Sequence, residues 1–144
     1  MVDIKSDIQL LRQVPLFAKL NESHLKKLAK RLVKREYEKG QVIITQGKGG
    51  EGLFIIRDGT AEAIRAHPDG EKIVVNEFKD MDFFGELALL DEGLRTASVI
   101  ATSDLSCFVL TSWDVKGILR DEPEIAISML EELANRFRRA LDTL

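Results

Sequence analysis

The sequence predicts a mainly β fold with helices at both ends, in a chain of 144 residues that suits a single domain. Nine of the ten glycines fall between Gly40 and Gly93, where turn-forming residues separate short runs of β-branched and aromatic residues. Before and after this stretch, apolar residues recur at the three-to-four-residue spacing of amphipathic helices. Many short strands in one region indicate a sandwich or a barrel.

Helices are expected before the β region, within residues 1–36. Ser6 and Gln9 have the spacing of a capping box, so a short helix should follow and end before Pro15. Asn21 is a favourable N-cap for a second helix. The apolar stripe of that helix is Leu25, Leu28, Ala29, Leu32 and Val33. Its basic face is either simply solvated or a surface for phosphates or a partner, and consists of Lys26, Lys27, Lys30, Arg31 and Lys34.

Strands are expected from Tyr37 to residue 111, because short β-branched and aromatic runs follow one another there. The runs are Val42–Thr45, Leu53–Ile56, Ile73–Val75, Ala97–Ile100 and Cys107–Leu110. The turn signal Pro68-Asp69-Gly70 separates residues 61–66 from residues 72–78. It predicts that these two segments pair as an antiparallel hairpin.

Helical patterning returns at Ser112 and continues to the end of the sequence. Pro123 suits the first turn of the last helix, where a missing N–H costs nothing. The apolar residues that follow are spaced alternately by three and four positions: Leu130, Leu133, Phe137, Ala140 and Leu144. This seam is equally compatible with packing on the helix's own domain and with a homodimer through the C-terminal helix.

Composition excludes several classes of function. The net charge of −3, from 21 basic and 24 acidic residues, argues against nucleic acid as a partner of this segment. The single cysteine, Cys107, excludes an intramolecular disulfide and a cysteine-ligated metal site, and it fits a cytoplasmic setting. His24 and His67 lack clustered partners, so we expect no metal, no catalytic residues and no enzyme. No apolar run approaches the length of a membrane span.

The segment 84–99 combines residues that suit a phosphorylated sugar. Gly85 allows the backbone to approach a ligand closely, and a turn over residues 87–90 would present unpaired N–H groups that attract anions. Arg95 can hold two phosphate oxygens, and Glu86 can accept a hydrogen bond from a sugar hydroxyl. These features together describe a nucleotide site. An exposed Glu86–Arg95 pair that closes a loop is an equally good interpretation from the residues alone.

The strings Phe84-Gly85-Glu86-Leu87-Ala88-Leu89-Leu90 and Arg95-Thr96-Ala97-Ser98-Val99 resemble the phosphate-binding cassette of the cyclic-nucleotide-binding domain family. That family includes the bacterial catabolite activator protein, the regulatory subunits of cyclic-AMP-dependent kinase and the cyclic-nucleotide-gated channels. The resemblance extends over nearly the whole chain. It implies one domain, with a double-stranded β-helix (a jelly-roll-like β-roll) at 37–111, N-terminal helices at 1–36, and hinge and lid helices at 112–144.

The resemblance also implies a role for each residue of the cassette. Glu86 would hold the ribose 2′-hydroxyl and Arg95 the cyclic phosphate, while the N–H groups of Ala88 and Thr96 would complete the phosphate cradle. Further ligand contacts are expected from Phe84, Gly85, Leu87 and Ala97. The ligand is cAMP or cGMP without a metal, and Thr96 does not decide between them.

We therefore expect a sensor in which the ligand draws the cassette inward and the hinge after Leu110 swings. The last helix would then close over the base, with Leu133 and Phe137 as lid contacts, although core packing also explains these two residues. The alternative is a ligand-free interaction module of the same fold that dimerises through the last helix. The sequence stops at Leu144, before the helix-turn-helix domain of DNA-binding members, so the effector stays open.

Overall fold

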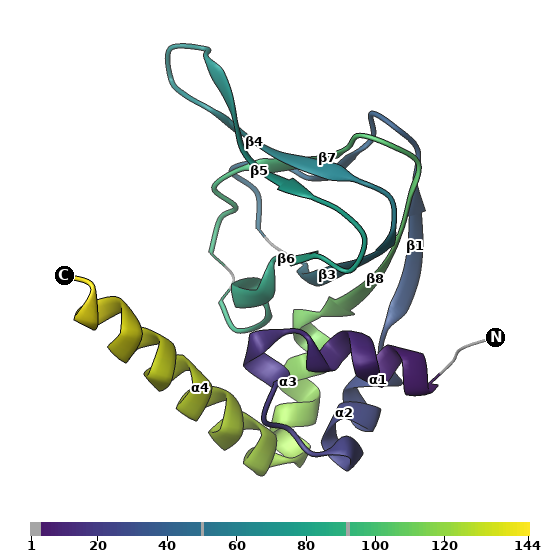
Figure 1. The fold of residues 1–144 in the computed structure, drawn as a ribbon, viewed down its shortest axis with the longest axis vertical. Coiled ribbons are helices and arrows are strands. Elements are labelled where there is room, and N and C mark those ends of the chain that lie inside the picture. The colour runs from purple at the N-terminus through teal and green to yellow at the C-terminus, as the bar shows by residue number, and fades with distance from the viewer. Residues whose placement is uncertain (1–3, 50, 92) are drawn as a thin grey trace. The chain divides into compact units, whose positions relative to one another are not determined.

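The computed structural model describes residues 4–49, 51–91 and 93–144 (Figure 1). The chain divides into two compact units. Residues 32–112 form a β unit, and residues 4–31 together with 113–144 form a helical unit. The fold class predicted from the sequence, mainly β with helices at both ends of the chain, is confirmed.

The helical unit contains four α-helices and one short 3₁₀ helix in its described residues. They are α1 (Ile4–Arg12), η1 (Pro15–Phe17), α2 (Glu22–Ala29), α3 (Ser112–Asp121), whose first residue belongs to the β unit, and α4 (Pro123–Asp142). Asn21 caps α2 as predicted, because its Oδ1 accepts a hydrogen bond from the His24 N–H at 2.8 Å. Pro123 occupies the first turn of α4, also as predicted.

The β unit consists of two four-stranded antiparallel sheets. Its elements are β1 (Val33–Tyr37), β2 (Val42–Ile44), β3 (Gly52–Asp58), β4 (Ala61–Ala66), β5 (Lys72–Phe78), β6 (Phe83–Phe84), the 3₁₀ helix η2 (Glu86–Leu89), β7 (Ser98–Ala101) and β8 (Leu105–Thr111). The strand orders are β1-β8-β3-β6 and β2-β7-β4-β5. Each sheet joins strands that are distant in sequence, as in a roll.

A hydrophobic core lies between the two sheets, since buried side chains of both contribute to one cluster. Its aromatic part is a stack of Phe54 on Phe84, whose ring centroids are 5.2 Å apart. Phe78 packs against the same Phe84 ring at 5.0 Å. Phe84 thereby anchors the start of the 84–99 segment to the core.

The predicted hairpin is confirmed with its predicted bounds, and β4 and β5 form a long ribbon in Figure 1. β5 carries a bulge, because Ala63 pairs with Asn76 whereas Ile64 pairs with Val74. Val75 is therefore the extra residue on β5, and β4 itself stays regular where it pairs with β7.

Two helix boundaries differ from the prediction. Ser6 lies inside α1 and is not its N-cap, because the apolar stripe through Ile8 and Leu11 extends back to Ile4. The second helix ends at Ala29, and Val33 begins strand β1, where it pairs with Val109 of β8. The β region therefore starts before Tyr37. The predicted basic face of α2 also loses Lys34, which lies on β1 and forms an ion pair with Glu36 at 3.6 Å.

The last helix buries a different stripe from the one predicted. Ile125 and Met129 are buried, and α4 contacts η1 within the helical unit. Leu130 and Phe137 of the predicted seam are 64% and 66% exposed. A spacing of three and four residues fits more than one face of a long helix, so it could not identify the buried one. The homodimer seam stays a prediction.

Candidate functional site

Arg95 lies in the loop between η2 and β7, and backbone hydrogen bonds fix it on both sides. Its N–H donates to the Lys48 carbonyl at 2.9 Å, and its own carbonyl accepts from the Gly47 N–H at 2.8 Å. A β-bridge between Gly49 and Leu94 continues the same pairing. The loop 45–49 therefore determines where the Arg95 backbone lies.

The Arg95 guanidinium is half-buried and only partly satisfied. Nη2 donates to the Gly52 carbonyl at 2.9 Å, whereas Nε is buried without an acceptor among the described residues. Burial lowers the pKa of Arg95 from its ordinary value, and the negative charge of Glu51 opposes that shift. Arginine stays protonated at neutral pH under these conditions, so the site holds a cation with an unused donor.

Gly85 is required by the geometry around Arg95. Its φ of 82° lies in the left-handed region, and a Cβ there would come within 2.4 Å of the Gly52 carbonyl oxygen and 2.8 Å of Nη1 of Arg95. The absence of a side chain lets β3, the cassette backbone and the guanidinium meet at one point. The sequence predicts that Gly85 lets the backbone approach a ligand. In the structure, the groups that would lie closest to a Cβ at position 85 are the Gly52 carbonyl and the Arg95 guanidinium.

The rest of the first string forms the single 3₁₀ turn η2. The Ala88 N–H, predicted to face phosphate, donates to the Gly85 carbonyl at 3.0 Å. Glu86 begins η2 and is half-buried, and Leu87 is exposed. Phe84 belongs to the core described above.

The second string leaves Arg95 and runs into β7. Thr96 is exposed, and its carbonyl accepts a hydrogen bond from Nε of Arg65 at 3.2 Å. Ala97 is half-buried against the core cluster. Ser98 begins β7, and its Oγ accepts from the Gln46 N–H at 2.9 Å.

A cavity of about 150 Å³ lies beside Arg95. Its lining mixes apolar and polar groups from β2, the loop after it, β3 and the loop before β7: Ile43, Ile44, Thr45, Lys48, Gly49, Glu51, Phe54 and Arg95. A larger cavity of about 540 Å³ elsewhere in the β unit is lined by the carboxylates of Glu36, Glu38, Asp58 and Asp104, among others. Four carboxylates repel a phosphate, so the smaller cavity is the better anion site despite its size.

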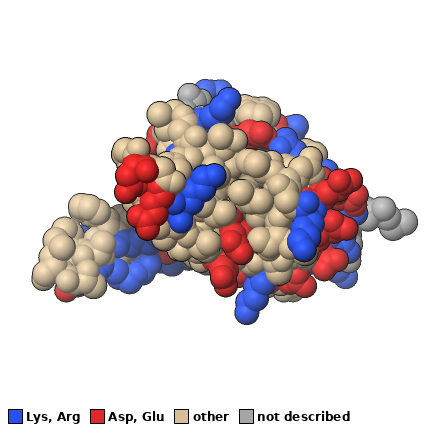
Figure 2. All heavy atoms as spheres, turned by 90° about the horizontal axis from the view of Figure 1, so that it is seen from above, with Lys and Arg blue, Asp and Glu red and all other residues tan. Residues whose placement is uncertain are grey.

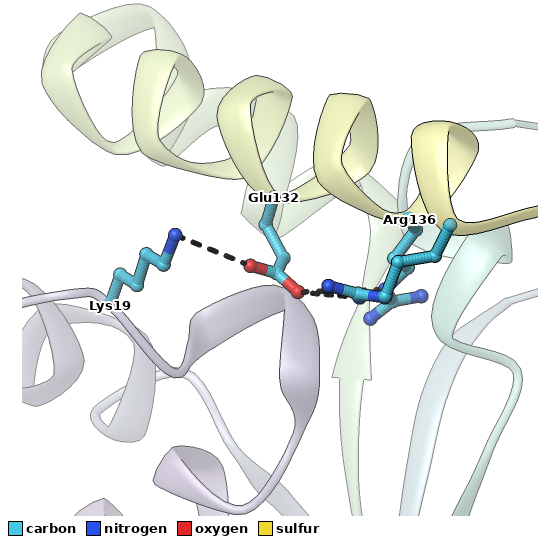
Figure 3. Close-up of polar contacts among 4 residues, drawn as sticks. Lys19, Glu132 and Arg136 are labelled. Carbon is cyan, nitrogen blue, oxygen red and sulfur yellow. Dashed lines mark ion pairs between the residues drawn. The ribbon is translucent and has the colours of Figure 1, made fainter. Parts of the chain in front are cut away.

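The two predicted lid residues lie on α4 in the helical unit, where Leu133 is half-buried and Phe137 exposed. Between them and the start of the helix, Glu132 forms ion pairs with three cationic groups. Figure 3 shows Glu132 between Lys19 and Arg136. The N–O distances are 3.9 Å to Lys19, 4.0 Å to Arg136 and 3.5 Å to Arg139. Lys27 of α2 forms a further ion pair with Glu122 in this unit.

Charged side chains of both signs are interspersed on the face seen in Figure 2. Within the described ranges, no cluster of three or more His, Cys, Asp or Glu side chains is arranged to hold a metal ion. No helix in that part of the chain is long and apolar enough to span a membrane.

Several residues that shape the site were not predicted from the sequence. Gly52 and Lys48 contact Arg95 through backbone carbonyls, which carry no side-chain signal. Arg65 and Gln46 reach the cassette from 31 and 52 positions away. No local motif marks such contacts, because they depend on the pairing of distant strands.

Residues 34–122 match the protein family described as "Cyclic nucleotide-binding domain". A CRP-like cAMP-activated global transcriptional regulator of Mycobacterium tuberculosis is 28% identical over 136 residues, which are 94% of this chain and 61% of that protein. A cAMP-dependent protein kinase regulatory subunit of Mycosarcoma maydis is 40% identical over 106 residues, 72% of this chain and 20% of that protein. The chain thus spans less than two thirds of these relatives.

The fold is also similar to solved structures. The N-terminal domain of a transcriptional regulator from Streptomyces coelicolor superposes with a TM-score of 0.86 at 28% identity, covering 94% of this chain and 96% of that domain. The domain that these comparisons share is a ligand-binding and not a catalytic one. The chain belongs to the cyclic nucleotide-binding domain family.

Proposed function

We propose that this chain is a sensor domain that binds a cyclic nucleotide through Arg95. The observation that carries the proposal is the buried Nε of Arg95, which finds no acceptor in the described part of the chain. A buried charged donor without an acceptor is costly, and a charge-assisted hydrogen bond removes that cost. The exocyclic oxygens of a cyclic phosphate supply two acceptors with the spacing of the guanidinium fork.

The other cassette residues take complementary roles in this proposal. Glu86, half-buried at the start of η2, accepts from the ribose 2′-hydroxyl. The Ala88 N–H already donates to the Gly85 carbonyl, so its hydrogen bond to the phosphate is a bifurcated one. Thr96, at the exposed end of the cassette, supplies a second N–H and a hydroxyl. Phe84, Leu87 and Ala97 shape the surroundings.

The ligand is a cyclic purine nucleotide, and the relatives favour cAMP. Both relatives described above carry cAMP in their names. Thr96 offers a hydroxyl that can meet the guanine amino group, so cGMP remains the competing ligand.

The route of the signal starts at the carbonyls next to Arg95. Gly52, whose carbonyl holds the guanidinium, pairs with Thr111 at the end of β8. The neighbouring Glu51 carbonyl accepts from the Ser112 N–H at 2.9 Å, at the first residue of α3. A phosphate that draws Arg95 away from Gly52 therefore perturbs the strand end from which α3 begins. The ligand shifts this equilibrium only by its differential affinity for the two arrangements. Leu133 and Phe137 of α4 then close over the base as the lid.

Isothermal titration calorimetry with cAMP and cGMP tests the proposal. The wild-type chain is expected to bind at one site, and Arg95→Ala is expected to abolish binding while remaining folded. The matched control is Arg57→Ala, which removes an exposed arginine of β3 whose guanidinium lies 6.0 Å from the Phe108 ring centroid. A folded wild-type chain that binds neither nucleotide contradicts the proposal.

A second candidate is a ligand-independent dimer through α4, favoured by the exposed Leu130 and Phe137. Sedimentation of the chain with and without cyclic nucleotide separates the two. A dimer that forms without ligand, in a chain that shows no calorimetric binding, supports this second function.

A further inference from the structure

Gln46 and Arg65 connect the β4–β5 hairpin to the loop segments around Arg95. Neither residue belongs to the cassette. Gln46 follows β2, and Arg65 lies near the end of β4. We refer to these two side chains together as the hairpin clamp.

Gln46 makes hydrogen bonds to Ala66 at the end of β4 and to Ser98 at the start of β7. Its Nε2 donates to the Ala66 carbonyl at 3.0 Å, and its Oε1 accepts from the Ala66 N–H at 2.8 Å. The side-chain amide therefore satisfies both backbone groups of Ala66, as a neighbouring strand would. Its own N–H donates to Oγ of Ser98, where β7 begins. Gln46 thus joins the ends of β4 and β7 to the loop that follows β2.

That loop is the one that holds Arg95. Gly47 and Lys48, the two residues after Gln46, make the backbone hydrogen bonds to the Arg95 carbonyl and N–H. A displacement of Gln46 therefore passes to the Arg95 backbone through directly bonded residues.

Arg65 holds the next residue of the cassette. β4 is regular, so Arg65 shares a face with Ala61 and Ala63, which lie in the core between the sheets. Arg65 continues that inner face beyond the core, and its Nε donates to the Thr96 carbonyl at 3.2 Å. The paired backbone ladder between β4 and β7 ends at Ile64 and Ser98. The Arg65 side chain therefore holds Thr96 just beyond the last ladder pair.

We propose that the hairpin clamp, Gln46 and Arg65, positions Arg95 and Thr96 for the phosphate, so that the β4–β5 hairpin tunes the affinity for the cyclic nucleotide. This inference rests on the proposed function for its ligand. Its structural half, the placement of Arg95 by Gln46, does not need the ligand. Gln46 and Arg65 are positioning residues, since they act through the residues that would touch the phosphate.

The test compares Gln46→Ala with Gln41→Ala. Gln41 is a matched control because its Oε1 also accepts a backbone N–H, that of Glu38 at 2.8 Å, within its own turn. Two readouts are taken on each variant: calorimetric affinity for cAMP and cGMP, and the NMR resonance of the Arg95 Nε–H group without ligand. Thermal unfolding of each variant shows how much of any change comes from global stability.

Loss of two neutral hydrogen bonds predicts that Gln46→Ala weakens both nucleotides by about tenfold and shifts or broadens the Arg95 resonance. Gln41→Ala is expected to leave both readouts at wild-type values. Arg65→Ala, at an exposed position, is expected to weaken binding by about threefold to tenfold, with partial rescue by Arg65→Lys.

One outcome would overturn the hairpin clamp, and another would overturn the proposed function alone. If Gln46→Ala and Gln41→Ala change affinity and the Arg95 resonance equally, the hairpin clamp does not position Arg95 and the inference is overturned. If the wild-type chain binds no cyclic nucleotide while Gln46→Ala still shifts the Arg95 resonance, the proposed function fails and the placement of Arg95 by Gln46 stands.

Discussion

Arg95 and Gly52 are joined by a 2.9 Å hydrogen bond from Nη2 to the carbonyl oxygen, which connects the cassette to the first residue of β3. A Cβ at position 85 would reach the same carbonyl oxygen. A phosphate that recruits Arg95 must therefore compete with a protein acceptor. The binding free energy therefore reflects the difference between the Arg95–phosphate and the Arg95–Gly52 interaction free energies. This competition couples ligand binding to β3.

Arg95→Lys separates the charge of the side chain from its shape. Lysine keeps the positive charge but lacks the planar fork, so it cannot hold two phosphate oxygens side by side. We expect binding to weaken by about tenfold or more, while the unfolding temperature changes little. Calorimetry and thermal unfolding measure the two effects. Undiminished affinity in Arg95→Lys would show that the fork is irrelevant.

Gly85→Ala should damage the site beyond its cost to the backbone. Gly70→Ala is the matched control, because Gly70 has a φ of 90° but nothing within 4 Å of its added Cβ. Both variants incur the left-handed strain of roughly 1–2 kcal/mol. Gly85→Ala adds a clash with Gly52 and Arg95, of the order of 1–3 kcal/mol for overpacking. Chemical denaturation of both variants measures the difference. Equal destabilisation, with unchanged nucleotide affinity, would contradict the close approach.

Glu132→Gln should weaken the helical unit more than Glu131→Gln does. Glu132 is 12% exposed and pairs with three cations, whereas Glu131 is exposed on the same helix. Removal of the Glu132 charge leaves Lys19, Arg136 and Arg139 to repel one another. We expect a loss of roughly 0.5–1 kcal/mol, reduced at high salt because the cations are partly exposed. Denaturation followed by circular dichroism at two salt concentrations measures it, and equal effects of both variants would refute the role of the cluster.

Cys107 should make the protein less stable at alkaline pH. Burial raises the pKa of its thiol from 9.0 to about 11, and the positive charge of Arg35 opposes that shift. Above pH 9 the unfolded chain loses the proton that the folded chain keeps, so ionisation favours unfolding. The stabilising effect is complete below pH 9 and is lost as the pH rises to about 11. The fall in unfolding free energy between these pH values should be smaller in Cys107→Ala. An identical fall in both proteins would disprove the assignment.

The β architecture was predictable from local signals, but its boundaries were not. The β4–β5 hairpin was predicted to the residue, because Pro68-Asp69-Gly70 fixes the turn and the turn fixes the strands. The apolar stripe of α2 continues through Val33 and so predicts a helix there. The pairing of Val33 with Val109, 76 positions away, assigns it to β1, and no local pattern reports such a pairing.

The site residues divide in a similar way. Glu86 and Arg95 were identified by residue type and spacing, and Gly85 by the close backbone approach that a glycine allows. Its positive φ of 82° is a finding of the structure. Gly52 contacts Arg95 through a backbone carbonyl, which any residue possesses, so the sequence carried no signal for it. Gln46 contacts Ala66 because the sheet brings the ends of β2 and β4 together, and no local sequence pattern reports that contact. The ligand roles themselves stay predictions.

NMR observation of the Arg95 Nε–H resonance during titration with cAMP tests the central claim most directly. This atom is buried without an acceptor in the described residues, so a phosphate that binds Arg95 must change its environment. We predict a saturable shift at one equivalent of cAMP and no shift with adenosine, which lacks the phosphate. Saturable binding of cAMP or cGMP that leaves this resonance unmoved, or binding of neither nucleotide, would contradict the account.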